Sequence, residues 1–410
     1  MHLQHGTGAG VVPVRGLGVG IALVTLSGAA MAQTRLPPVA SADGRVAPRP
    51  GGIVLDVMNP PGTSYLDPEI HPERPEMVFQ MAGDVWVGAL DPGTGLFVSA
   101  TGQDVFVDRA ASLTVARNGP EYGLDRDGTA IFYNRNDVGG RVRIWRATPL
   151  GGTFVTEPLT ALDGDRINPL VSQDPLAAST YVAYARFGPT PPSSIAWLDE
   201  ALPAVDNDIT PVLPGFAGFR WARGSSLLTS TVAAGLDAGQ VVLVDASTGI
   251  ERVVTDDAGI KFDPFPWFAP EFGGALAVAA IVNGSDIAVY RDTGGPTFDR
   301  VALLPVPTGT TMSFAQSHEP FVSGGRSYLS LTLKDDPGSI YTDVTESQIW
   351  VYGIEPGPGR FTLRCDDGEA GRIRHEAETM AGTNETFLYY NELRPSGRFD
   401  VIRCRTGLSP

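Results

Sequence analysis

One segment of about fifty residues recurs along this chain, and that recurrence constrains the fold more than any single motif. In residues 118–136, "NGPEYGLDRDGTAIFYNRN", a proline precedes a polar turn, and an apolar run follows that turn. Comparable segments are led by Pro68, Pro169, Pro264 and Pro320. Fainter copies start near residues 215 and 375, so residues 51–405 hold seven units of roughly 51 residues each.

Each unit also carries a second apolar run in which alternate positions are hydrophobic. The alternating pairs are Val85/Val87, Val142/Ile144, Ile195/Trp197, Val241/Leu243, Ile287/Val289, Ile349/Val351 and Phe399/Val401. This period of two predicts strands, and the apolar residues between them predict sheets that are covered on both faces. Because one unit cannot bury both faces alone, we expect an all-β fold, a seven-bladed β-propeller of four-stranded antiparallel blades. A β-sandwich is the alternative fold, but it does not explain seven repeats.

The two ends of the repeat region predict how the ring closes. The last unit ends after its third strand, whereas residues 51–59, "GGIVLDVMN", are a strand without a partner in the first unit. We expect residues 51–59 to supply the outer strand of the last blade. The alternative is a loose extension, with residues 406–410 as a tail at the other end.

The composition limits the classes of partner. The formal net charge is −16, and glycine and proline number 49 and 34. An acidic surface disfavours nucleic acid, because phosphate contacts need clustered lysine and arginine. It favours cations, basic partners or neutral ligands.

The first 32 residues have the pattern of a secretory signal peptide. A short apolar stretch follows Arg15, and Ala30 and Ala32 occupy the positions that a signal peptidase reads. We expect cleavage after Ala32, a disordered proline-rich leader over residues 33–50, and a periplasmic or extracellular protein without a stable membrane span. A short membrane anchor is the alternative.

Two cysteines, Cys365 and Cys404, raise the question of a disulfide in an oxidising compartment. In the expected register, Cys365 ends the outer strand of blade six and Cys404 ends the third strand of blade seven. Consecutive strands run antiparallel, which places these two ends on opposite faces of the ring. We therefore expect no bridge, since a disulfide needs Cα atoms within about 7 Å.

Catalytic signatures are missing from the sequence. There is no GxSxG elbow, no HExxH pair and no phosphate-binding P-loop. No catalytic residue is assigned on this basis, and the sequence favours a non-enzymatic role while leaving an enzyme open.

One cluster of polar residues defines a candidate site on the rim of the ring. We expect two histidines to precede corresponding inner strands of blades six and seven, each followed by a glutamate, and the nearby loops to add acidic residues. The candidate ligand-binding residues are His318, Glu319, His375, Glu376, Asp335, Asp336, Tyr341 and Asp343. The candidate metal ligands are His318, His375, Asp366 and Asp367. Imidazoles and carboxylates suit a divalent cation or a cationic ligand, whereas the alternative is that these residues cap turns.

Arg220 and Trp221 of blade four are further ligand-binding candidates at the channel mouth. Several aromatic residues lie in or beside the inner-strand segments: Tyr65, Tyr122, Phe265, Trp267 and Phe321. Some can stack on a sugar or a peptide, but most are expected to fill the wedges between blades.

The repeat resembles a known family. Residues 119–160 read "GPEYGLDRDGTAIFYNRN…GRVRIWRATPLGGTFVTEPLT", with a proline and an aromatic, a D-G turn, two apolar strands around Ile131 and Ile144, a glycine turn and a closing "L-T". This order is similar to the WD40-like (PD40) repeat of TolB-type propellers, over roughly residues 55–405. The resemblance implies a rigid scaffold that binds a protein, an envelope polysaccharide or an envelope peptide. The alternative function is a carbohydrate-active enzyme, a polysaccharide lyase or hydrolase, with a metal-assisted site at the channel mouth.

Overall fold

The computed structural model describes most of the chain from residue 53 onward. The described residues are 53–109, 119–137, 139–161, 163–187, 194–203, 207–209, 219–224, 226–231, 239–307, 310, 312–335, 346–355 and 360–410. The expected signal peptide and leader, residues 1–50, lie outside this part of the chain.

The described chain forms 28 strands and one short 3-10 helix, η1. The first three blades are built from β2 (Leu66–Ile70), β3 (Glu76–Met81), β4 (Asp84–Ala89) and β5 (Val105–Asp108); β6 (Glu121–Asp125), β7 (Gly128–Asn136), β8 (Val142–Leu150) and β9 (Thr153–Pro158); and β10 (Asp165–Val171), β11 (Tyr181–Phe187), β12 (Ser194–Asp199) and β13 (Asn207–Ile209). The next two are β14 (Phe219–Arg223), β15 (Ser226–Thr231), β16 (Gln240–Asp245) and β17 (Ile250–Val253); and β18 (Lys261–Ala269), η1 (Pro270–Phe272), β19 (Ala275–Val282), β20 (Asp286–Arg291) and β21 (Asp299–Leu304). The last two are β22 (Phe314–Ser323), β23 (Arg326–Lys334), β24 (Ser347–Gly353) and β25 (Thr362–Arg364); and β26 (Ile373–Ala381), β27 (Thr386–Leu393) and β28 (Phe399–Arg405), with β1 (Leu55–Val57).

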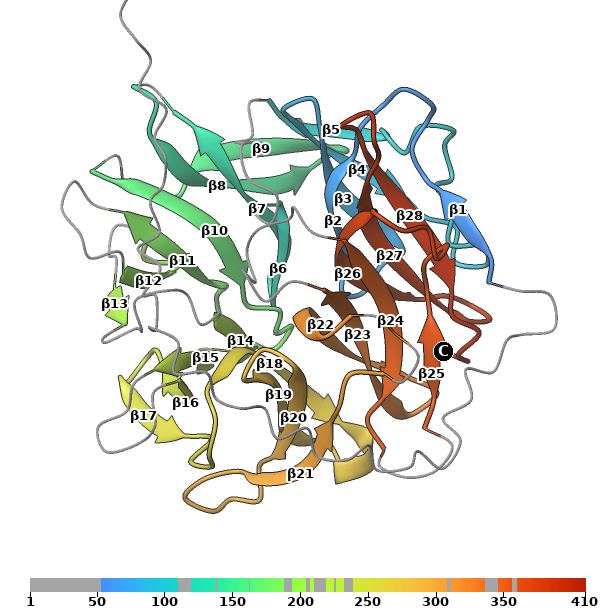
Figure 1. Ribbon diagram of the computed structural model, residues 1–410. Helices are drawn as coiled ribbons and strands as arrows, with labels where there is room; N and C mark the ends of the chain where they lie inside the picture. The colour runs from blue at the N-terminus through green and yellow to red at the C-terminus, as the bar shows by residue number, and fades with distance from the viewer. Residues whose placement is uncertain are drawn as a thin grey trace, which may run out of the picture. The chain divides into compact units, whose positions relative to one another are not determined.

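The strands pair into seven four-stranded antiparallel sheets, arranged as the blades of a seven-bladed β-propeller. Six sheets follow chain order from the inner to the outer strand, and the inner strands β2, β6, β10, β14, β18, β22 and β26 surround the axis (Figure 1). This confirms the fold predicted from the repeat. Within the described residues, no helix is long and apolar enough to cross a membrane.

The ring closes through the strand predicted for that role. β1 pairs antiparallel with β28, and Leu55 stands opposite Cys404. The seventh sheet therefore combines one strand from the start of the chain with three from its end. The expected clasp is confirmed.

The hydrophobic core is divided into wedges between neighbouring blades. Among the described residues there are seven buried clusters, and each joins two adjacent blades. In the wedge between blades seven and one, Tyr65 stacks on Phe79 with ring centroids 4.3 Å apart. Because apolar residues cover both faces of each blade, every blade depends on two neighbours for burial.

Before three of the five repeat prolines, Pro68, Pro169 and Pro264, the preceding residue has an unusual backbone conformation. Asp67, Asn168 and Asp263 have φ angles of 47°, 57° and 47°, which aspartate and asparagine tolerate better than most residues. Each of these residues lies in a β-bulge of its inner strand. A bulge changes the direction of the side chains that follow it. The D-P and N-P dipeptides therefore set the orientation of the residue after each proline.

A second repeated feature is an asparagine clamp between blades. Asn391 accepts a hydrogen bond from the Asp67 backbone N–H at 2.7 Å and donates to the Tyr65 carbonyl at 3.0 Å. Asn134 makes the same two contacts to Asn168 N–H and Arg166 C=O, at 3.2 Å each. The clamp therefore joins blade seven to blade one, and blade two to blade three.

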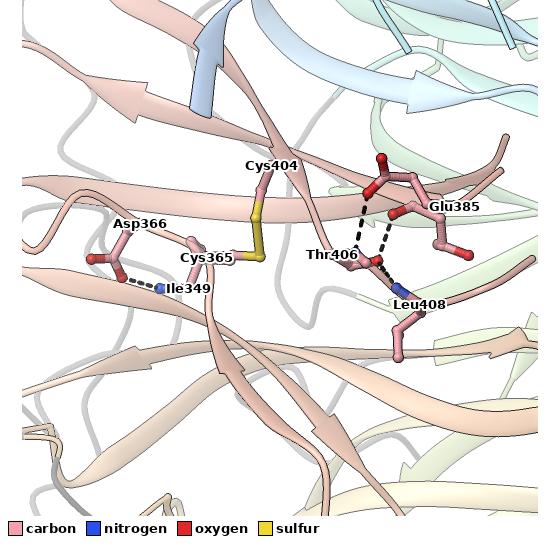
Figure 2. Close-up of a disulfide and its surroundings, with 9 residues drawn as sticks. Ile349, Cys365, Asp366, Glu385, Cys404, Thr406 and Leu408 are labelled. Atoms are coloured by element: carbon pink, nitrogen blue, oxygen red, sulfur yellow. Dashed lines mark hydrogen bonds between the residues drawn. A yellow bond between two sulfur atoms is a disulfide. The ribbon is translucent and has the colours of Figure 1, made fainter. Parts of the chain in front are cut away.

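The expectation that Cys365 and Cys404 stay apart is wrong. The two cysteines form a disulfide with Cα atoms 5.8 Å apart, between the end of β25 and the strand β28 (Figure 2). The prediction considered strand direction alone. Neighbouring strands are rotated by about 20–25° by the twist of each sheet, which tilts the outer strand of blade six relative to the third strand of blade seven.

Candidate functional site

The inner strands bring one comparable residue from each blade to the axis of the ring. In chain order these residues are Glu69, Glu121, Leu170, Arg220, Phe265, Glu319 and Glu378, and all seven line one cavity. Glu69, Leu170 and Phe265 directly follow the bulged D-P or N-P dipeptide, and Glu378 follows the bulge of β26. The bulges therefore position four of the seven residues of the cavity wall.

The cavity has a volume of about 560 Å³, which lies within the range of small-ligand sites. Its wall is divided by chemistry. Glu319, Glu378, Glu69 and Glu121 come from four consecutive blades, the sixth, seventh, first and second, and form an acidic wall. The opposite side is an aromatic wall, formed by Leu170, Arg220, Trp221, Phe265 and Phe268.

The carboxyl groups of the acidic wall resist ionisation. They line the cavity yet lie deep inside the ring, and this burial raises the pKa of Glu69, Glu319 and Glu378 well above the usual range. Repulsion between neighbouring carboxylates raises these pKa values further: Glu121 and Glu319 act on Glu69, Glu378 acts on Glu319, and Glu69 acts on Glu378. Burial raises the pKa of Glu121 to about 7. An unliganded cavity therefore retains protons near neutral pH.

Arg220 is the basic residue of the ring of seven. Its Nη1 lies 4.0 Å from an Asp263 carboxylate oxygen, and its guanidinium lies 4.9 Å from the centre of the Phe265 ring. Burial alone would lower the pKa of Arg220, but Asp263 and the glutamates hold it above its usual value. Trp221 donates its indole N–H to the Leu170 carbonyl at 2.8 Å, which fixes the ring in the wall.

Further charged residues lie where the cavity reaches the turns that follow the inner strands. His71 accepts hydrogen bonds at Nδ1 from the backbone N–H groups of Glu73 and Arg74. Burial, with a contribution from Arg74, lowers the pKa of His71 to about 4, so this imidazole is neutral. Arg223 lies 3.7 Å from Asp174 and packs over Phe268.

The two predicted rim histidines lie inside inner strands and do not precede them. His318 belongs to β22 and His375 to β26, and both are buried. The ring of His318 packs edge-on against Phe265, whereas His375 packs against Phe399. Burial lowers the pKa of His318, so its imidazole is held neutral.

The bulges also change the predicted alignment of the two strands. Glu319 pairs across its blade with Ser330. In β26 the bulge after His375 shifts the register, and the next residue to pair is Glu378, opposite Tyr389. Glu378 and not Glu376 is therefore the partner of Glu319 in the acidic wall. Of the predicted ligand-binding residues, the cavity brings together Glu319, Arg220 and Trp221.

The remaining predicted acidic residues have structural contacts or lie elsewhere. Asp366 accepts a hydrogen bond from the Ile349 N–H group (Figure 2). It also accepts from the Gly368 N–H group and from Arg364 Nε. Asp367 accepts from Glu369 N–H and Arg374. Asp335 is exposed at the end of β23.

Asp336, Tyr341, Asp343 and the Glu376 side chain lie outside the described residues. Within the part that is described, no group of three or more histidine, cysteine, aspartate or glutamate side chains is arranged to hold a metal ion.

The predicted aromatic packing also divides into two classes. Tyr65, Tyr122, Trp267 and Phe321 are buried, in the wedges between blades, as expected for most of them. Phe265 lines the cavity, and Trp267 both packs in its wedge and contributes to the cavity wall.

Sequence reasoning missed three of the four glutamates of the acidic wall, Glu69, Glu121 and Glu378. The signal for two of them was present in the repeat itself, where a glutamate follows the lead proline at Pro68-Glu69 and Pro120-Glu121. Glu378 carries no such signal, because the bulge in β26 lacks a proline.

No protein-family profile and no curated protein matches this chain. Solved structures with a similar fold include a protein of unknown function from Dyadobacter fermentans, with 11% identity and a TM-score of 0.42, covering 70% of this chain and 94% of that one. A TolB-like protein from Agrobacterium tumefaciens has 16% identity and a TM-score of 0.39, covering 69% and 88%. The sialidase of Trypanosoma rangeli has 9% identity and a TM-score of 0.43, covering 84% of this chain and 60% of its own length. These similarities concern the fold and carry no argument about function.

Proposed function

We propose that this chain is an exported binding scaffold that recognises a protein, an envelope polysaccharide or an envelope peptide through its axial cavity. The observation that carries the proposal is the cavity of about 560 Å³, whose wall receives a residue from every inner strand. Recognition residues on strands of a closed ring are held more rigidly than residues on loops. Such a site needs no moving part to bind a ligand.

A thermal-shift screen tests the scaffold function. The purified protein is screened against divalent metals, acidic and neutral oligosaccharides, and envelope peptides, beside Arg220→Ala and the exposed control Arg126→Ala. We expect one ligand class to raise the Tm of the wild type and of the control but not of Arg220→Ala. If a ligand shifts all three proteins equally, binding does not use the cavity and the proposal fails.

Export is part of this proposal. The apolar stretch before Ala32 supports a cleaved signal, and the Cys365–Cys404 disulfide supports an oxidising compartment. N-terminal sequencing of the mature protein should begin at Gln33. A mature protein that begins at Met1 would contradict export by this route.

We also place the chain among the TolB-type WD40-like propellers as a proposal. The supporting observations are the proline-led inner strand, the D-G turn between β6 and β7, and closure by β1. A profile built from the seven units of this chain should match proteins of that family above proteins of other propeller families; an equal match to both would count against it.

A carbohydrate-active enzyme is the second candidate, and the carboxyl groups of the acidic wall favour it. Burial raises the pKa of Glu319 and Glu378 well above the usual range, as a general acid requires. A hydrolase fits this wall better than a uronic-acid lyase, because an acidic wall repels a carboxylate substrate. Release of reducing ends from neutral polysaccharides, lost in Glu319→Gln, would establish the enzyme; no release by the wild type would exclude it for the polysaccharides tried.

A further inference from the structure

We propose that the axial cavity binds an organic cation carried on a slender apolar stem, such as a primary amine or a guanidinium. The cation would lie against the acidic wall and the stem against the aromatic wall. The inference rests on the proposed binding function, because it names the ligand class of the same cavity.

The charges around the ring are not balanced across the axis. The four glutamates occupy blades six, seven, one and two, whereas Arg220 projects from blade four and is engaged by Asp263 and Phe265. Among the described residues, no lysine or arginine forms an ion pair with Glu69, Glu121, Glu319 or Glu378. A bound cation would supply the positive charge that this wall lacks.

The remaining wall suits the apolar part of such a ligand. Leu170 and Phe265 flank Arg220 in the ring, and Trp221 is fixed beside them by its hydrogen bond to the Leu170 carbonyl. Methylene groups lose contact with water on this surface, which favours binding. A cation at the boundary of the two walls also meets the face of an aromatic ring.

The arrangement of the carboxyl groups favours an organic cation over a metal ion. In the described part of the chain, no three acidic or histidine side chains converge as metal ligands. Calcium takes six to eight oxygen atoms at about 2.3–2.6 Å. An ammonium or guanidinium group instead offers three to five N–H donors, which can reach carboxyl groups spread over several blades.

Binding of a cation is expected to release protons. Other titratable and charged side chains also lie around the acidic wall. They are Asp67 of β2 and Arg220 of β14, Glu73, Arg74 and the neutral His71 in the turn after β2, and Arg223 at the end of β14. Burial raises the pKa of the four wall carboxyls, and repulsion among Glu69, Glu319 and Glu378 adds to it, so the empty cavity holds protons that a cation would displace. Affinity should therefore increase from pH 5 to pH 8.

Calorimetric titration of the purified full chain with 1,5-diaminopentane tests the inference. We expect binding that weakens at least tenfold in Glu378→Gln and is unchanged in Glu251→Gln, an exposed control on β17. The neutral analogue 1,5-pentanediol should not bind, and the wild-type heat should differ between phosphate and Tris buffers at pH 7, which reports proton release without any variant. Equal binding of diamine and diol, or no binding of diamine, overturns the inference.

Two further arms separate the sources of the cation and the two proposals. A capped Gly-Lys-Gly peptide that competes with the diamine identifies a lysine side chain of a protein as a source, whereas a peptide that cannot compete identifies a free amine. If a neutral oligosaccharide binds and the diamine does not, with binding lost in Arg220→Ala, the scaffold function stands and the cation inference fails. If neither Arg220→Ala nor Glu378→Gln changes the binding of any ligand, both the scaffold function and the cation inference fail.

Discussion

The disulfide between Cys365 and Cys404 provides a quantitative test of how the ring is held shut. It joins the end of the outermost strand of blade six to β28 of blade seven, and β28 pairs in its own sheet with the clasp strand β1. The two cysteines are 39 residues apart in the sequence. A crosslink over a loop of this length restricts the unfolded chain by about 4 kcal/mol in the chain-entropy account.

The predicted shift follows from the size of the domain. Unfolding a domain of roughly 350 residues involves an entropy change of about 0.7 kcal/mol per kelvin. Loss of about 4 kcal/mol should therefore lower the Tm by roughly 5 °C. Both cysteines are fully buried, so alanine is a better replacement than serine, whose hydroxyl would need a hydrogen-bond partner.

The assay compares calorimetric Tm values of the wild type, the two single alanine variants and the double variant. Because either single substitution removes the bond, all three variants should show about the same loss. A thiol assay of the denatured wild type should find no free thiol. Two free thiols per chain, or a double variant as stable as the wild type, would refute the reasoning.

Three other predictions concern the ring. Burial holds the pKa of Glu121 at about 7, above its ordinary value of 4.5, so the stability that its protonated form contributes is present at low pH and lost as the pH rises through 7. In urea unfolding, Glu121→Gln should match the wild type near pH 4 and be up to about 3 kcal/mol more stable than the wild type at pH 8. A difference between the two proteins that does not change with pH would contradict this. Asn391→Ala leaves the buried Asp67 N–H and Tyr65 C=O without their clamp and should cost about 1–3 kcal/mol by the same measurement, with no cost if the clamp does not form. Deletion of residues 51–57 removes β1 and should lower the Tm by several degrees, whereas an unchanged Tm would mean that the clasp does not close the ring.

The sequence alone predicts the architecture, because the repeat is a direct consequence of how a blade is stabilised. A blade with apolar residues on both faces needs a neighbour on each side, so its pattern must recur. The unpaired strand over residues 51–59 predicts closure for the same reason. These features depend on period and count, both of which are visible in one sequence.

The site depends on local geometry that the sequence does not display. The adjacent His-Glu pairs at residues 318 and 375 look equivalent, but the bulge between His375 and Glu378 places a different glutamate in the wall. A shift of one residue in a strand moves a side chain to the other face. The disulfide was missed for a related reason, because strand twist brings Cys365 and Cys404 together.

A crystal structure of the protein grown with 1,5-diaminopentane at pH 8 tests the central claim, that the ring of inner-strand residues is the recognition site. It should show an amine nitrogen within hydrogen-bonding distance of at least two of Glu69, Glu319 and Glu378, with the carbon chain beside Phe265. A cavity that contains only water at saturating diamine, or a diamine bound elsewhere on the ring, would contradict it.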